Sequence, residues 1–172
     1  MAANEPGMTR APASRLQRLF LRGPVVMYRG PLAELFRWRC VMLLTTTGCK
    51  TGKPRTTGVS FMPDGDRYII FSGWGVTSNW YRNVRANPRV TIRVGRRTMA
   101  ADARLVEDPD ERVALMRRMR DRSGSCGPPR LMRPLLRLSG LFDYDAEIRM
   151  AIEAGADIPV IALVPVEDSV AF

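Results

Sequence analysis

The chain is organised around the stretch from Leu43 to Gly58, which reads LLTTTGCKTGKPRTTG. Apolar and β-branched residues at 41–47 predict a buried strand that leads into a turn at 48–53, called the lysine turn below. Residues 56–62 then predict the returning strand. The stretch therefore predicts two strands joined by a polar turn, and the rest of the chain is interpreted around that turn.

The lysine turn has the chemistry of an anion site. The chain holds 27 lysines and arginines, but Lys50 and Lys53 are its only lysines, and Arg55 follows them closely. Two ammonium groups, a guanidinium and several hydroxyls, on a turn that exposes backbone N–H groups, suit a phosphate. A P-loop is excluded, because Gly48 and Gly52 are separated by three residues and a proline follows the second lysine. The other interpretation is an ordinary solvated turn.

Length and charge bound the class of protein. A chain of 172 residues with 45% apolar residues fits a single domain, which we expect at 14–172 after a disordered tail at 1–13. The net charge of +10 indicates an anionic partner or surface. No motif places a helix in a DNA groove or a row of aromatic residues on an open sheet, so nucleic acid is not expected as a partner.

Histidine and cysteine usage narrows the chemistry. The sequence contains no histidine, which excludes serine- or cysteine-histidine catalysis and histidine-based zinc sites. Cys40, Cys49 and Cys126 are odd in number and far apart, so neither a CxxC redox pair nor a thiolate metal site is expected. We also find no signal-like segment and no apolar run of about 20 residues. These features predict a cytoplasmic protein that does not span a membrane.

The remaining pattern predicts mostly antiparallel strands with helices among them. The expected elements are strands at 67–72, 90–94, 99–105 and 158–164 and helices at 14–22, 25–38, 78–84, 108–122, 131–138 and 146–154. The helix at 108–122 has a clear start, since Asp108 can cap it and Pro109 suits its first position. Pro159 predicts that the last strand lies at a sheet edge. The pattern indicates an α+β fold, or a small barrel with added helices.

The helix expected at 14–22 is short, basic and amphipathic. Leu16, Leu19 and Phe20 form one stripe, and arginines occupy the other. It either packs on the core with a solvated basic face, or lies on an anionic membrane or over the substrate pocket. The sequence therefore leaves peripheral membrane contact through 14–22 open.

Several clusters of residues resemble the deazaflavin-dependent nitroreductase family, whose best-known members use coenzyme F420. They are LTTTGCKTGKPRTT at 44–57, DGDRY at 64–68, WYRN at 80–83, ANPRV at 86–90 and IPV at 158–160. The clusters occur in the family's order and at nearly its spacing. The family has a split β-barrel related to the FMN-binding oxidase fold. The resemblance therefore implies an α+β split β-barrel of mostly antiparallel strands with flanking helices.

The resemblance also implies a set of cofactor contacts. Lys50, Lys53 and Arg55 fall on the phosphate side, in agreement with the chemistry of the turn itself. The residues implied to lie along or near the ring are Thr56, Thr57, Gly58, Ser72, Trp80 and Asn83. Core packing is the other interpretation of Trp80, since large aromatic residues are often buried for area alone. A buried Asn83 amide needs hydrogen-bond partners, which a cofactor can supply.

The implied function is that of an oxidoreductase that transfers a hydride from reduced F420 to a small unsaturated, quinone-like or nitro compound. Such a reaction needs neither histidine nor a metal. The final proton could come from water or from the hydroxyl of Ser60 or Tyr81. The same fold with FMN as cofactor, and a non-catalytic protein that binds a cofactor or lipid, are the alternatives.

Departures from the family pattern limit what can be carried over. Gly58 stands where many members have proline, and Trp74 stands in a segment where they have two glycines. Both changes fall where the substrate pocket is implied, so the identity of the substrate is not implied by the resemblance. Related barrels are commonly dimers, which makes a homodimer a prediction by fold analogy alone.

Overall fold

The computed structural model describes residues 25, 28, 38, 40–122, 126 and 158–166. Its elements are β1 (Val41–Thr47), β2 (Pro54–Asp64), β3 (Arg67–Phe71), α4 (Asn79–Ala86), β4 (Arg89–Val94), β5 (Arg97–Leu105), α5 (Pro109–Arg122) and β6 (Val160–Pro165). The tail and helices predicted at 1–13, 14–22, 131–138 and 146–154 lie outside the described residues, as does most of 25–38. Of the helices in the described part, none is long and apolar enough to span a bilayer.

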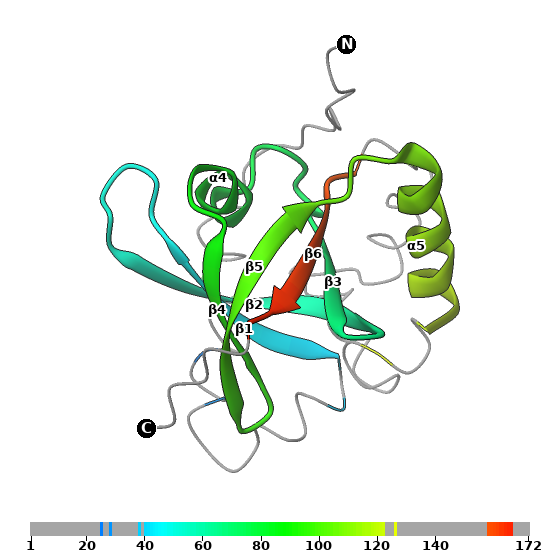
Figure 1. The fold of residues 1–172 in the computed structure, drawn as a ribbon, viewed down its shortest axis with the longest axis horizontal. Helices are drawn as coiled ribbons and strands as arrows, with labels where there is room; N and C mark the ends of the chain where they lie inside the picture. Colours follow the sequence, from blue (N-terminus) through cyan, green and yellow to red (C-terminus); the bar gives the residue numbers. More distant parts are fainter. Residues whose placement is uncertain are drawn as a thin grey trace, which may run out of the picture.

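The strands form a closed antiparallel barrel in the order β1-β2-β3-β6-β5-β4 (Figure 1). The pairing of β1 with β4 closes it, with Leu44 opposite Ile92. In Figure 1, α4 lies at one end of the barrel beside the tip of the β1–β2 hairpin, and α5 runs along the flank next to β3. The predicted α+β split barrel with flanking helices is confirmed.

The position of β6 differs from the prediction. The sequence predicts an edge strand because Pro159 has no N–H, but β6 lies between β3 and β5 in the closed barrel. Pro159 stands one residue before the strand, and its carbonyl accepts a hydrogen bond from the backbone of Ser72 at 3.0 Å. The missing donor therefore falls outside the strand ladder and does not weaken it.

Alternation along the strands produces two apolar layers. The larger layer fills the barrel, and its strand residues are Met42, Leu44, Val59, Phe61, Ile70, Val90, Ile92, Val94, Ala101, Ala103, Ile161 and Leu163. Tyr81 and Val84 of α4 join this layer. The second layer, on the outer faces of β2, β3 and β6, is covered by Leu115 of α5. Thus α4 packs into the barrel core and α5 covers the side of the barrel.

Ion pairs attach α5 to the β2–β3 hairpin. Arg67 donates to Asp64 at 2.9 Å and to Glu111 at 2.7 Å, and Arg118 donates to Asp64 at 2.8 Å. Burial by itself would raise the pKa of Asp64, but the hydrogen bonds from Arg67 and Arg118 outweigh it and hold that pKa below its ordinary value. Hydrogen bonds to Glu111 and Asp64, opposed by burial, raise the pKa of Arg67.

Candidate functional site

The lysine turn is closed by its own backbone. Gly48 donates to the carbonyl of Lys53 at 2.9 Å, and the carbonyl of Gly48 accepts from Thr51 and Gly52 at 3.1 and 2.7 Å. Gly52 has φ +65°, a left-handed conformation that glycine adopts without strain. The expectation that the turn exposes its backbone N–H groups is therefore wrong for Gly48, Thr51 and Gly52. An anion at this turn must be held mainly by side chains.

Three cationic side chains lie at or beside this turn. Lys50, Lys53 and Arg55 are all exposed. None of them pairs with a carboxylate in the part of the chain that the structure describes. Figure 1 shows the reason, because the tip of the β1–β2 hairpin (cyan) projects beyond the barrel. The structure places all three predicted phosphate-side residues at or beside the hairpin tip, and an anion among them would relieve any repulsion between their charges.

Asn83 connects α4 to the lysine turn. Its side-chain oxygen accepts from the backbone N–H of Cys49 at 3.0 Å, and its Nδ2 donates to Thr46 Oγ1 at 2.9 Å. The hydroxyl of Thr46 also lies 3.5 Å from the carbonyl of Arg55. With Asn83 only 7% exposed, both polar atoms of this amide have partners within the protein.

One edge of β2 is open over part of its length. Residues 54–60 pair with β1, whereas 61–64 pair with β3. Phe61 donates a backbone hydrogen bond to the carbonyl of Cys40. In an antiparallel pair every second residue bonds to the partner strand, so the backbone N–H and C=O groups of Thr56 and Gly58 point away from β1. No described strand pairs with them on that side. Such an edge can take up the rim of a planar polar ligand or another strand.

The side chains near the open edge are hydroxyls. Thr56 Oγ1 lies 2.8 Å from Thr45 Oγ1 across the β1–β2 ladder. Thr57 Oγ1 lies 3.5 Å from the carbonyl of Gly58, a long contact at the limit of a hydrogen bond. Consecutive strand residues point to opposite faces, so Thr56 and Thr57 place one hydroxyl on each face of β2 next to the cations of the turn.

Ser72 directly follows β3, and Trp80 lies in the first turn of α4. Ser72 is fully buried, and its hydroxyl donates to the carbonyl of Gly75 at 2.7 Å, so it closes the loop that leads into α4. Trp80 is half-buried, packs against the barrel core and meets Tyr81 edge-on at a centroid distance of 6.3 Å. Their assignment to the ring of a cofactor stays a prediction.

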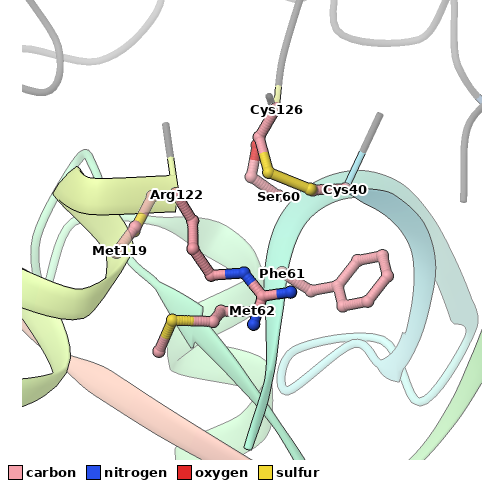
Figure 2. Close-up of a pocket in the computed structure, with 7 residues that line it drawn as sticks. All are labelled: Cys40, Ser60, Phe61, Met62, Met119, Arg122 and Cys126. Atoms are coloured by element: carbon pink, nitrogen blue, oxygen red, sulfur yellow. A yellow bond between two sulfur atoms is a disulfide. The ribbon is translucent and has the colours of Figure 1, made fainter. Parts of the chain in front are cut away.

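The two hydroxyls considered as proton donors, those of Ser60 and Tyr81, lie in different parts of the barrel. Tyr81 is 4% exposed and belongs to the barrel core. Ser60 is exposed but lies six residues along β2 from Pro54, which is about 20 Å from the lysine turn at the rise of an extended strand. It lines a small pocket with Cys40, Phe61, Met62, Met119, Arg122 and Cys126 (Figure 2). That pocket is at the opposite end of the β1–β2 ladder from the turn.

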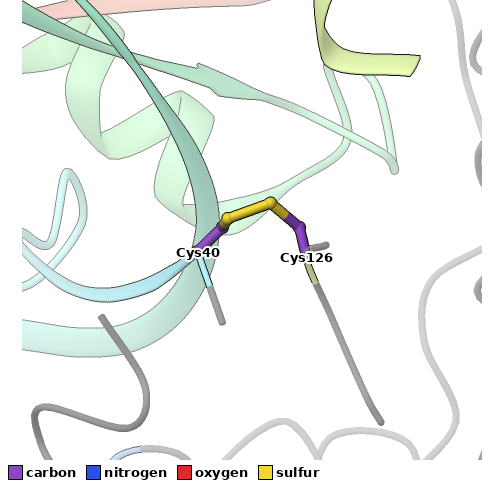
Figure 3. The surroundings of a disulfide bond; sticks show 2 residues. All are labelled: Cys40 and Cys126. Atoms are coloured by element: carbon purple, nitrogen blue, oxygen red, sulfur yellow. A yellow bond between two sulfur atoms is a disulfide. The ribbon is translucent and has the colours of Figure 1, made fainter. Parts of the chain in front are cut away.

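A disulfide was not predicted from the sequence. Cys40 and Cys126 are bonded, with their Cα atoms 5.2 Å apart (Figure 3). Their separation of 86 residues carries no local signal, and only the fold brings the start of β1 to the segment after α5. Cys49, in the lysine turn, is a free and exposed thiol.

The arrangement fits a long ligand with one anionic end and one planar end. Three exposed cations without carboxylate partners in the described part of the chain suit the anionic end. The open edge of β2 offers backbone donors and acceptors for the planar end. Within the described ranges, no group of His, Cys, Asp and Glu could hold a metal ion.

Comparison with known proteins identifies related sequences. A family model described as F420H(2)-dependent quinone reductase matches residues 21–127. An F420H(2)-dependent quinone reductase of Mycobacterium tuberculosis is 43% identical over 74 residues, which cover 40% of this chain and 50% of that protein. A relative from Mycobacterium bovis matches with the same identity and coverage. The chain thus spans about half the length of the curated relatives it matches.

A solved structure shares the fold. HutZ, the heme storage protein of Vibrio cholerae, has a TM-score of 0.51 at 19% identity, over 80% of this chain and 89% of that one. A likeness at this identity concerns the fold alone. The residues matched by the family model, 21–127, include the lysine turn, the open edge of β2 and α4.

Proposed function

The chain belongs to the F420H(2)-dependent quinone reductase family, and we propose on this premise that it transfers a hydride from reduced coenzyme F420 to a small quinone-like, unsaturated or nitro compound. The family match covers more than half of the chain and confirms the resemblance to F420-dependent reductases. One observation carries the proposal: Lys50, Lys53 and Arg55 gather at the hairpin tip with no carboxylate partner among the described residues.

The cationic tip would hold the charged end of the cofactor. F420 carries a phosphate and an oligoglutamate tail, and both are anionic. Lys50 and Lys53 act as point charges, whereas the planar guanidinium of Arg55 can donate two parallel hydrogen bonds to one phosphate or carboxylate. Because all three are exposed, they can follow a tail of variable length.

The open edge of β2 would meet the ring. The backbone of Thr56 and Gly58 offers donors and acceptors at strand spacing, and Thr57 contributes a hydroxyl between them. Trp80 would pack near the ring with the part of its indole that α4 leaves accessible. In this proposal, Ser72 acts by fixing the loop before α4, since its hydroxyl is already bound to Gly75.

Reduced F420, when bound, supplies the hydride and both electrons. The protein then has to bind it, orient it and admit the second substrate. Of the two hydroxyl candidates for the final proton, Ser60 lies far along β2 and Tyr81 lies in the core. We therefore propose water as the source of that proton.

Titration of the purified protein with oxidised F420 and with FMN, followed by cofactor fluorescence, tests the proposal. We expect saturable binding of F420, and turnover of quinones or enones with reduced F420. Binding of FMN without any response to F420 would favour a flavin enzyme of the same fold. Binding of F420 without turnover across quinones, enones and nitroaromatic compounds would favour a non-catalytic cofactor-binding protein.

A cytoplasmic location, with contact to anionic membranes through residues 14–22, is also proposed. The basic pattern of that segment and the net charge of +10 support the contact. Co-sedimentation with anionic vesicles at low salt measures it, and a protein that stays in the supernatant would count against it. Cytoplasmic reductants oppose disulfides, so alkylation before cell lysis would report the state of Cys40 and Cys126.

A homodimer is proposed from the analogy with related barrels. Sedimentation velocity over a range of concentrations is the measurement. A monomer at every concentration would contradict the proposal.

A further inference from the structure

We propose that Asn83 is a positioning residue, which fixes the lysine turn to α4 through Cys49 and Thr46 and so sets the affinity for the anionic end of the cofactor. It acts without contact to the reacting atoms. The identity of the ligand rests on the proposed function, but the contacts of Asn83 do not.

The orientation of the amide follows from its neighbours. A backbone N–H can only donate, so the atom that faces the nitrogen of Cys49 at 3.0 Å is the oxygen, and Nδ2 donates to Thr46 at 2.9 Å. Thr46 is 2% exposed. Having accepted from Asn83, its hydroxyl directs its own proton to the carbonyl of Arg55, 3.5 Å away. Polar contacts therefore run from α4 through β1 to β2, and the last of them, at 3.5 Å, is at the limit of a hydrogen bond.

These contacts reach both sides of the cationic tip. Cys49 immediately precedes Lys50, and Arg55 follows the turn on the opposite strand. The bonds inside the turn close it on itself but do not attach it to the rest of the barrel. Asn83 provides that attachment from a rigid support, because its neighbours Tyr81 and Val84 are buried in the barrel core.

A fixed turn binds an anion better than a loose one. Ordering side chains and loops on binding reduces affinity, and preorganisation avoids that loss. The projecting tip has few other supports, since its cations are exposed and form no ion pair with the described residues. Loss of the Asn83 amide should therefore free the turn while leaving the ring site on β2 unchanged.

The test compares Asn83→Ala with Asn79→Ala, an exposed asparagine in the first turn of the same helix. The hydrogen bond from Cys49 to Asn83, called the clamp below, is measured without any cofactor by hydrogen exchange of the Cys49 amide. Titration with F420 measures the affinity. For Asn83→Ala we expect Cys49 exchange to rise and the Kd for F420 to rise, each by about tenfold, which corresponds to about one lost hydrogen bond. The kcat at saturating F420 should not change. Asn79→Ala should behave as the wild type.

A second pair of variants guards against a folding defect in Asn83→Ala. Thr46→Val removes the hydroxyl at nearly constant shape and should weaken F420 binding as Asn83→Ala does. Thr46→Ser keeps the hydroxyl and should bind F420 with the affinity of the wild type. Slow Cys49 exchange in Asn83→Ala would overturn the inference. So would fast exchange with an unchanged Kd, or a lower kcat at saturating F420.

Failure of the proposed function gives a different result. If the wild-type protein does not bind F420, the proposed function is wrong. The clamp is then decided by the Cys49 exchange rates alone, in which wild type and Asn79→Ala should be slow and Asn83→Ala fast.

Discussion

Removal of two of the three cations at the hairpin tip should weaken F420 binding and reduce its dependence on salt. The variant is Lys50→Ala combined with Arg55→Ala, which leaves Lys53 in place. Both side chains are exposed and form no ion pair with the described residues. The substitutions should therefore change the charge of the site without a measurable change in the free energy of unfolding.

The exposure of these side chains sets the size of the effect. Two unit charges about 4 Å apart attract by about 1 kcal/mol in bulk water and by about 4 kcal/mol at the effective dielectric constant near a protein surface. Fully exposed pairs fall at or below the lower value, so we take about 0.5–1 kcal/mol for each cation. Loss of both then costs about 1–2 kcal/mol, which is a rise of about 5- to 30-fold in the Kd for F420.

The assay is fluorescence titration of F420 at low and at moderate salt. The matched control is Arg97→Ala combined with Arg117→Ala, which removes the same charge from exposed positions on β5 and α5. The control should bind F420 as the wild type does. Equal losses in the two double variants would mean that the overall charge, rather than the turn, attracts the cofactor. Unchanged binding in the tip variant would refute an anion site at the lysine turn.

Three further predictions concern stability. Arg67→Leu should lower the free energy of unfolding by about 1–2 kcal/mol in urea denaturation at neutral pH. Because the folded-state pKa of Asp64 lies below the ordinary value of 3.8, this contribution is complete above that value and is lost as the pH falls through the folded-state pKa, so a difference from wild type that persists in strong acid would contradict the network. Reduction of the Cys40–Cys126 disulfide should lower the free energy of unfolding by about 2–4 kcal/mol. An equal melting temperature with and without reductant would show that the bond does not stabilise the fold. Gly52→Ala should cost about 1–2 kcal/mol, since φ is +65° and open space leaves only backbone strain; unchanged stability would mean that the turn adopts another conformation.

Elements with a strong local signal were predictable from the sequence. The apolar and β-branched run predicted β1 with its observed bounds, 41–47. The start of α5 was also predicted, and Asp108 accepts from the backbone of Asp110 at 3.0 Å as a cap should. Ser78 stands at the predicted N-cap of α4 but makes no side-chain hydrogen bond there. Local patterns thus located the elements better than the contacts at their ends.

Features that depend on distant partners were not predictable. The neighbours of β6 are set by where β3 and β5 lie in space, so the absence of an N–H on Pro159 was taken for an edge signal. The disulfide is a second case, because Cys40 and Cys126 meet only after the barrel has formed and α5 has packed on its flank. The separation of residues along the sequence predicts neither the neighbours of β6 nor the disulfide.

The candidate site likewise has one part that could be predicted from the sequence and one part that could not. Lys50, Lys53 and Arg55 could be chosen from the sequence, because residue type and spacing determine which charges share a turn. The supports of that turn could not, since Asn83 lies 37 residues from Thr46 and 34 from Cys49. Variants separate the two contributions. Loss of the cations should lower the affinity for F420 and leave the exchange rate of the Cys49 amide unchanged. Loss of the Asn83 amide should lower the affinity and accelerate that exchange. Equal exchange rates in the two variants would show that the charge of the turn and its position do not depend on different residues.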